Sequence, residues 1–498
     1  MTLNNDEFYI NAKIIDTALA TNSATDEVID LIKHKSYENY FFKNVKSIDW
    51  FFPLKQQGYF SAENAPGPEE IEEDGVYRIP QWNVLPYLER VSEQVNIPGN
   101  EKYIGELLDI IRNVTQYHIE HNKKLDNYRT WWYFAKILLN IPNDKIPPDI
   151  IDLIPVWLDS KFDATLPGTE IVTKLLPKFL TDNPDDIKKA EKIIEYVTAL
   201  KTVASNQGKT KSFVIDSYWL KEAFKKYSET IGEKCSINVI KDLSEKIKTL
   251  LENKEDGAYR SFYDEPEYLL GKPVEILTFI LKRVLLAKVR SNFAETKEIL
   301  RNFFKDEYLY FPKMALFIIG QNIDRYSGLF WEIMSTKTGV HIMANTLYFG
   351  DELRYLLEHL KGLTEEQRKI LAEKIDEAVR SLNFKEDQNR LKLLHKQEIY
   401  KALSNDSYFK NLYEKMKQMT KADVELGPAI GKVETQVGPG LSPLTKEKIL
   451  KMPNDKIARF LASFKTKDLW KGPTVGGLAD VLKEAVKEKP EKFIEDLN

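Results

Sequence analysis

Apolar residues recur at intervals of three and four through most of this sequence, which is the spacing that places them on one face of a helix. One such series comprises Ile104, Leu107, Leu108, Ile111 and Val114. The same pattern covers residues 131–139, 150–158, 171–180 and 187–200. The breaks between the series contain proline, glycine, asparagine or aspartate, which end helices. We therefore predict an all-α protein with very little strand.

The spacing of the predicted helices suggests how they are arranged. Helices start roughly every 20 residues, so a two-helix unit would repeat at roughly 40, the period of HEAT and armadillo arrays. The 498 residues also exceed what one compact core accommodates. We predict an irregular α-solenoid of HEAT/armadillo-like helix pairs. No strict residue-for-residue repeat accompanies the helix spacing, so an irregular multi-helix bundle is the alternative.

Changes in composition divide the chain into four predicted parts. Residues 1–100 are rich in aromatic residues and proline and would form an irregular N-terminal cap. Residues 101–419 would form the helical-repeat region. Residues 420–443 are rich in glycine and proline and read as a linker, in which the alternation at 433–437 fits a short strand or extended chain. Residues 444–498 would form a small helical segment.

Two local signals concern helix ends. Thr364 followed by Gln367 is a capping box, which predicts a helix over residues 365–382. At the other end of the sequence, the apolar pattern at 491–493 is that of a helix about to begin. That pattern would fit the N-terminal part of a longer protein.

Composition and charge favour a folded, cytoplasmic protein. Apolar residues make up 43% of the chain and charged residues 30%, as in ordinary globular proteins. The net charge of −4 gives no global field for a polyanion, although a local basic groove is compatible with it. The single cysteine, Cys235, excludes an intrachain disulfide and a cysteine-rich zinc site. No signal-peptide pattern and no apolar stretch near the ~20 residues of a membrane span occur in the sequence.

The most enzyme-like cluster is His118, Glu120 and His121, since two histidines and a carboxylate within one helical turn resemble a metal-ligand set. The spacing does not match, because zinc-protease helices need histidines four residues apart, or two residues between the first histidine and the glutamate. We expect these side chains to be polar positions on a helix. Its opposite face is expected to carry Ile111, Val114 and Ile119.

Gly208, Lys209 and Thr210 resemble the end of a phosphate-binding P-loop. The opening glycine is absent, because Val203 stands in its place. A P-loop also follows a strand, whereas residues 193–200 have a helical pattern. We therefore expect an exposed connection between helices at this position.

Two weaker features also point away from catalysis. The acidic run within residues 69–74 lacks the ligand spacing and glycine of a calcium loop, so we expect a solvated loop. Cys235 beside Lys234 lacks a nearby histidine to act as its base, so a part-buried structural thiol is expected. The sequence thus predicts no catalytic residue, no cofactor site and no metal site.

Aromatic residues are densest near the N-terminus, where they could be either core or interface anchors. Trp82 precedes Val84, Leu85 and Leu88 at helical spacing, so we assign it to the core. The consecutive rings of Trp50, Phe51 and Phe52 cannot all point to one side of a helix. These three residues are the candidate partner-binding residues.

The same segments carry a resemblance to known proteins. Residues 49–60 (Asp-Trp-Phe-Phe-Pro-Leu-Lys-Gln-Gln-Gly-Tyr-Phe) and 79–90 (Ile-Pro-Gln-Trp-Asn-Val-Leu-Pro-Tyr-Leu-Glu-Arg) resemble the N-terminal helical region of large bacterial proteins of antiphage-defence type. Residues 441–450 and 476–482 are similar to an element further along in such proteins. The resemblance implies a sensor or scaffold role in defence and transfers no catalytic residue.

Three functions are compatible with these observations. The first is a non-catalytic helical-repeat scaffold or sensor that binds another protein, because repeats expose long surfaces and catalytic motifs are lacking. The second is an enzyme whose site assembles from residues distant in sequence. The third is a nucleic-acid-binding solenoid with a local basic groove.

Overall fold

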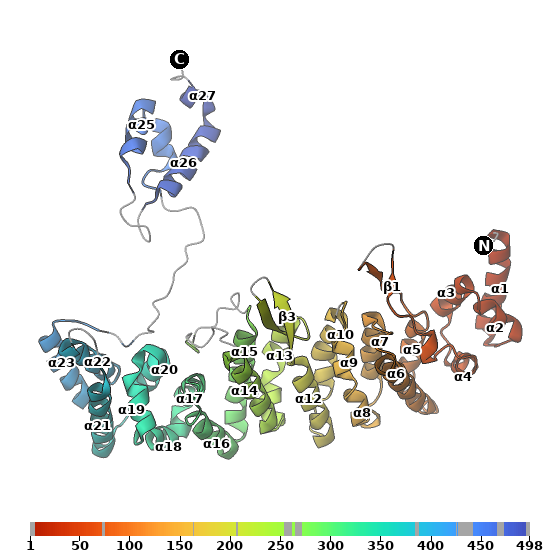
Figure 1. Ribbon diagram of the computed structural model, residues 1–498, viewed down its shortest axis with the longest axis horizontal. Coiled ribbons are helices and arrows are strands. Elements are labelled where there is room, and N and C mark those ends of the chain that lie inside the picture. The colour runs from red at the N-terminus through yellow and green to blue at the C-terminus, as the bar shows by residue number, and fades with distance from the viewer. Residues whose placement is uncertain are drawn as a thin grey trace. The chain divides into compact units, whose positions relative to one another are not determined.

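The computed structural model describes residues 5–71, 75–162, 164–205, 208–252, 261–263, 271–383, 388–424, 426, 442–465 and 473–494. The chain divides into two compact units, which we call unit 1 (Met1–Ala429) and unit 2 (Ile430–Asn498). Helices dominate the described part of both, so the all-α prediction is confirmed (Figure 1). The predicted boundaries at residues 100, 419 and 443 stay predictions, and the alternating segment 433–437 lies outside the described residues.

Unit 1 begins with short helices and a small hairpin. These elements are α1 (Asn5–Thr21), α2 (Asp26–Ile32), α3 (Lys35–Asn44), the 3-10 turn η1 (Ile48–Trp50), α4 (Phe51–Gln56), η2 (Ala62–Asn64), β1 (Glu69–Glu70), β2 (Tyr77–Arg78) and α5 (Leu85–Glu93). The next elements are α6 (Lys102–Glu120), α7 (Tyr128–Asn140), η3 (Asn143–Lys145), α8 (Pro148–Ile151), α9 (Ile154–Leu158), α10 (Thr165–Glu170), the π-helical turn η4 (Ile171–Leu175), α11 (Leu176–Lys178) and α12 (Pro184–Val197).

A second hairpin separates these elements from longer helices. It consists of β3 (Leu200–Ser205) and β4 (Gly208–Phe213). The helices that follow are α13 (Ser217–Lys234), α14 (Ile237–Glu252), α15 (Pro273–Ser291), α16 (Phe293–Phe303), α17 (Tyr310–Gln321), α18 (Ile323–Met334), α19 (Lys337–Ala344), α20 (Thr346–Glu358), α21 (Glu365–Ser381), α22 (Gln388–Ala402) and α23 (Ser407–Thr420). None of the described helices is both long and apolar enough to cross a bilayer.

Packing within unit 1 is serial. The principal contacts join elements close in chain order, such as α5 with α7, α7 with α10, α13 with α15, α17 with α20 and α22 with α23. Figure 1 shows the helices of unit 1 following one another in that order. One continuous apolar core runs beneath them from Ile15 to Leu426. Serial contacts are what a repeat architecture requires, and the HEAT/armadillo-like solenoid stays a prediction.

Cationic side chains from later elements tie these helices together. Each donates to carbonyl oxygens at the C-terminal end of an earlier helix, where the helix dipole is negative and carbonyls lack intrahelical partners. The donors and acceptors are Arg90 to Phe42, Lys178 to Leu138, Lys246 to Glu195, Lys288 to Cys235 and Arg325 to Val289. Donor and acceptor are between 36 and 53 residues apart. This interval brackets the period of roughly 40 residues expected of helix-pair repeats.

The helix predicted from Thr364 is confirmed. The Thr364 hydroxyl accepts from the backbone N–H of Gln367 at 3.2 Å, and the Gln367 side chain accepts from the backbone N–H of Thr364 at 2.9 Å. Helix α21 then runs to Ser381, one residue short of the prediction.

The hairpin β3–β4 corrects the prediction at residues 193–200. Helix α12 ends at Val197, and the chain turns into strand at Leu200 instead of continuing as helix. Leu200 pairs with Phe213 at the base of the hairpin, where Phe213 enters the core. Thr202, Val203 and Thr210 are β-branched residues, which favour strand.

Unit 2 is a small helical module. Its described helices are α24 (Lys446–Lys451), α25 (Asn454–Ser463), α26 (Val475–Glu488) and α27 (Pro490–Ile494). Helix α24 packs against α26, and α26 against α27. Its buried core comprises Ile449, Ile457, Leu478 and Ala485.

Candidate functional site

The structure separates the three candidate partner-binding residues. Trp50 and Phe51 are buried in the core, and only Phe52 is exposed, at 38% of its surface. The Trp50 ring packs against Phe41 at 4.9 Å between centroids, and the Phe52 ring lies 5.2 Å from Tyr103. A partner therefore cannot reach Trp50 or Phe51 in this fold, because the end of η1 and the start of α4 turn them inward. Partner binding by Phe52 stays a prediction.

Trp82 is buried, as predicted. It lies just before α5, whose inward face carries Leu85 and Leu88. This arrangement is the one expected of an aromatic residue at a helix entrance that packs onto the apolar face following it.

The histidine cluster on α6 is oriented differently from the prediction. His118 is buried and Ile119 is 47% exposed, so these two residues exchange the faces expected for them. The reason is helical spacing, because His118 follows Val114 by four residues and so lies on the apolar stripe. The His118 ring packs edge-on against Trp131 at 5.2 Å, and burial lowers its pKa.

The two histidines do not converge on a common point. His121 is exposed and stacks on Tyr117, and its Nδ1 donates to the Tyr117 carbonyl at 2.9 Å. Throughout the part of the chain that the structure describes, no group of three or more His, Cys, Asp or Glu side chains is arranged to hold a metal ion.

The P-loop-like residues are part of a hairpin. Gly208, Lys209 and Thr210 lie in β4 and pair antiparallel with Val203–Ser205 of β3. They therefore do not form the phosphate-binding loop that precedes a helix in a P-loop. In the acidic run, Glu69 lies in β1 and forms an ion pair with Arg78. Glu70 also lies in β1 and is exposed, whereas Glu72, Glu73 and Asp74 lie outside the described residues.

Cys235 is fully buried at the end of α13, and burial raises the pKa of its thiol to about 12. Cys235 is among the residues that line a groove of about 670 Å³, together with Glu191 of α12 and Lys288 of α15. At neutral pH the protonated thiol is a poor nucleophile. Cys235 is therefore not an activated nucleophile in this fold.

A buried charge cluster lies between α15, α17 and α20. Glu352 accepts from the backbone N–H of Phe262 at 2.6 Å, while Lys282 donates to the Phe262 carbonyl at 3.0 Å. Lys313 Nζ lies 3.6 Å from the other Glu352 oxygen. Burial raises the pKa of Glu352 to about 7, and the Lys313 charge opposes that shift. All three charged side chains are buried, so the cluster holds the segment 261–263 in the core and offers no access to a substrate.

Exposed aromatic side chains gather at the two hairpins of unit 1. Beside β2, the rings of Tyr77 and Phe162 lie 5.2 Å apart, and Leu166 of α10 is also exposed. Beside β4, Tyr218 and Trp219 begin α13, with ring centroids 5.1 Å apart. Both are exposed, Tyr218 by 58%. Figure 1 shows both hairpins on the same side of unit 1, with α10 between them.

Lysines accompany the second aromatic pair. The hairpin carries Lys201, Lys209 and Lys211, and residues 200–215 contain no acidic residue. Lys201 and Lys209 are exposed, and Lys211 donates to the Thr202 hydroxyl at 3.0 Å. Asp216 follows and caps α13, accepting from the backbone N–H groups of Tyr218 and Trp219. The candidate functional site, which we call the hairpin edge, comprises Tyr77, Phe162, Leu166, Lys201, Lys209, Lys211, Tyr218 and Trp219.

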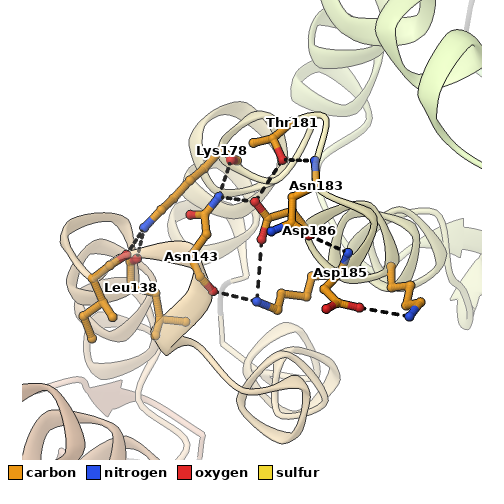
Figure 2. A network of polar contacts seen from close by, with 10 residues as sticks. Leu138, Asn143, Lys178, Thr181, Asn183, Asp185 and Asp186 are labelled. Carbon is orange, nitrogen blue, oxygen red and sulfur yellow. Dashed lines mark hydrogen bonds and ion pairs between the residues drawn. The ribbon is translucent and has the colours of Figure 1, made fainter.

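A polar junction connects α7, α11 and α12 (Figure 2). Lys178 Nζ donates to the carbonyl oxygens of Leu138 at 2.7 Å, Leu139 at 2.9 Å and Ile141. Asn143 Nδ2 donates to the Lys178 carbonyl and to Asp186 Oδ2, both at 2.9 Å. The lysine thus satisfies the C-terminal end of α7, and the asparagine fixes the lysine's own backbone.

The same junction occurs in unit 2. Lys492 Nζ donates to the carbonyl oxygens of Ile449 at 2.6 Å, Leu450 at 2.8 Å and Met452 at 2.7 Å, and Asn454 Nδ2 donates to the Lys492 carbonyl at 2.7 Å. The sequences correspond: residues 138–146 read Leu-Leu-Asn-Ile-Pro-Asn-Asp-Lys-Ile, and residues 449–457 read Ile-Leu-Lys-Met-Pro-Asn-Asp-Lys-Ile. We call this arrangement the PNDKI junction. It corrects the expectation that the chain has no residue-for-residue repeat.

No protein-family model, curated protein or solved structure matches this chain significantly.

Proposed function

We propose that this chain is a non-catalytic, cytoplasmic helical-repeat scaffold or sensor that binds another protein through the hairpin edge. The observation that carries the proposal is the exposed Tyr218–Trp219 pair at the start of α13, which directly follows the lysine-bearing hairpin β3–β4 in the chain. Large aromatic rings bury much area at small entropic cost, and basic residues around them steer an acidic partner.

The serial packing of unit 1 supports a binding role. Repeats that contact mainly their neighbours form a long surface on which hairpins and helix ends stand out. Glu352, a buried carboxyl group with a raised pKa, is enclosed and accepts a hydrogen bond from Phe262, which weighs against a catalytic role for it. A place in a bacterial antiphage defence assembly rests on the sequence resemblance alone.

Nucleic-acid binding is the second candidate, because bases also stack on exposed aromatic rings beside lysines. Three lysines on one hairpin and a net charge of −4 give a polyanion little long-range attraction. We therefore favour a protein partner with acidic residues around an apolar contact.

The test is quantitative capture from the native cytoplasm after nuclease treatment. The double variant Tyr218→Ala, Lys209→Glu should lose the partner that the parent chain retains. The matched control is Tyr408→Ala, because Asp406-Ser-Tyr-Phe409 at the start of α23 repeats the Asp216-Ser-Tyr-Trp219 cap and also exposes its tyrosine. Equal capture by the parent chain and the double variant would refute the proposal, and loss of the partner on nuclease treatment would favour nucleic acid.

A further inference from the structure

The hairpin β3–β4 leaves one edge of its sheet without a neighbouring strand. Its strands pair one-to-one over six residues, from Leu200 opposite Phe213 to Ser205 opposite Gly208. β4 also packs against α15, whereas the principal contacts of β3 in the described part of the chain are with β4 alone. Figure 1 shows the hairpin projecting beyond the helices beside it. Among the described residues, the outer edge of β3 is therefore open.

The hydrogen-bond pattern of the hairpin determines which backbone groups of β3 face this open edge. Ala199 lies opposite Val214 and accepts from its backbone N–H at 3.1 Å, so these two residues form a hydrogen-bonded pair. Hydrogen-bonded and non-hydrogen-bonded pairs alternate along an antiparallel ladder. Thr202 and Ala204 therefore direct their N–H and carbonyl groups away from β4, and no described residue forms a hydrogen bond with these groups.

β3 lacks most of the features that protect an exposed strand edge. Prolines, bulges and very short strands prevent another chain from pairing with an edge. β3 contains no proline, its register has no bulge, and Thr202 and Val203 are β-branched residues that favour pairing. The remaining protective feature is lysine, whose charge repels a basic strand but attracts an acidic one.

A lysine charge lies on each face of the hairpin at this edge. The side chain of Lys211 crosses from β4 and donates to the Thr202 hydroxyl at 3.0 Å, so its ammonium group lies over β3. Lys201 is exposed and precedes Thr202, so it points to the opposite face. Val203 lies on the same face as Lys201, because alternate residues of a strand share a face. A strand added beside β3 would meet one positive charge on each of its own faces.

We propose that β3 receives an extended acidic segment of a partner protein as a third strand of this sheet. Two neighbouring acidic residues of the segment would lie opposite Lys201 and Thr202, the second of them close to Lys211. The next residue would be β-branched or aromatic and would lie opposite Val203. A second copy of this chain fits poorly, because its β3 would bring the same lysines. The inference rests on the proposed binding function and names the way in which the partner engages the hairpin.

The test uses the peptide Thr-Val-Glu-Glu-Val-Thr with both ends blocked, whose palindromic sequence presents the same residues in either strand direction. Exchange of individual backbone amides with water is measured by NMR on the isotopically labelled full-length chain. In the free chain the Thr202 and Ala204 amides should exchange freely. At about 1 mM the peptide should slow both about tenfold, if its dissociation constant is about 0.1 mM. The matched control peptide is Thr-Val-Lys-Lys-Val-Thr, which should leave both unprotected.

Variants of the chain locate the binding edge. Ala204→Pro removes an outward N–H and no ladder hydrogen bond, so the hairpin should form while the peptide no longer protects Thr202. Ala204→Val keeps this N–H and should respond as the parent chain does. Protection of the Val203 amide, which faces β4, checks that the hairpin persists. Lys201→Glu leaves the backbone unchanged and should weaken peptide binding about tenfold, which provides the same test if Ala204→Pro disrupts the hairpin.

Four results would overturn the proposal. They are protection of Thr202 and Ala204 in the free chain, no protection by the acidic peptide, equal protection by the two peptides, and a peptide effect that survives both Ala204→Pro and Lys201→Glu. Concentration-dependent dimerisation that Ala204→Pro abolishes would assign the edge to a second copy of the chain. Each of these results leaves capture that depends on Tyr218 and Lys209 unaffected, so failure here is distinguishable from failure of the proposed function.

Discussion

Replacing Lys178 with methionine should loosen the C-terminal turn of α7. The substitution keeps the length of the side chain and removes an ammonium group that donates to three carbonyl oxygens. A hydrogen bond from a charged donor contributes about 1.5–3 kcal/mol, but one ammonium shared by three half-buried acceptors does not contribute three times that amount. We therefore expect a loss of about 2–4 kcal/mol in local stability.

Hydrogen–deuterium exchange measures this loss without assuming that the whole chain unfolds as one unit. A loss of 2 kcal/mol corresponds to exchange about thirtyfold faster in peptides covering residues 134–146. Burial lowers the pKa of Lys178 to about 8, so the assay is done at pH 7, where the parent side chain is charged.

The matched control is Lys174→Met on the same segment. Lys174 is exposed and pairs with the buried carboxylate of Glu170, which also accepts from Trp132 Nε1, so this control removes a lysine of the same segment that makes no contact with the α7 carbonyls. If Lys178→Met accelerates exchange no more than Lys174→Met, the junction does not stabilise the end of α7. Lys492→Met should have the corresponding effect on α24, because the same three contacts recur there.

Three further predictions concern the core. The pKa of Glu352 is about 7 in the fold against 4.5 for the free group, so the folded state binds more protons between these values and stability should fall as pH rises through that window. Glu352→Gln, which keeps an acceptor for the Phe262 N–H, should remove up to about 3 kcal/mol of this pH dependence in denaturant titrations at several pH values. If the free energy of unfolding of the variant still falls with pH as in the parent chain, Glu352 is not the group responsible. Trp50→Ala should lower the free energy of unfolding by about 3–5 kcal/mol in thermal denaturation. Phe52→Ala should lower it by less than about 2 kcal/mol because its ring is partly exposed. Equal losses of stability in the two variants would contradict the difference in burial between the two rings. A thiol reagent should modify Cys235 in the native chain on the order of a thousandfold more slowly than in the denatured chain at pH 8, because the raised pKa removes the thiolate; comparable rates would mean the thiol is accessible and ionised.

Helical periodicity was enough to predict the fold class, because each amphipathic series indicates a helix independently of the rest of the chain. The start of α21 could likewise be predicted from local sequence, since Thr364 and Gln367 lie within one helical turn. The orientation of His118 was also available in the sequence, because its spacing from Ile111 and Val114 places it on their stripe. Because histidine is polar, we expected His118 on the solvent-exposed face of α6, but its helical spacing places it on the buried face.

Other features depend on contacts that no local pattern encodes. The cluster of Lys282, Lys313 and Glu352 comes from three separate helices, so its residues have no common spacing. The hairpin β3–β4 was missed because Leu200 continues the apolar pattern of α12, although tertiary packing of Phe213 favours strand. The PNDKI repeat was detectable by direct comparison of 138–146 with 449–457, but the two copies are much further apart than one helix-pair period.

The cations that bind the ends of earlier helices also bear on how the chain folds during synthesis. Each helix end receives its cation from a residue 36 to 53 positions later. At a synthesis rate of about 5–20 residues per second, that partner emerges from the ribosome about 2–10 seconds after the helix it completes. When one of these five helices is the most recently made, its C-terminal end therefore still lacks its cation. A chain truncated between a helix and its cation would retain that defect permanently, whereas truncation after the cation would leave the preceding helices complete.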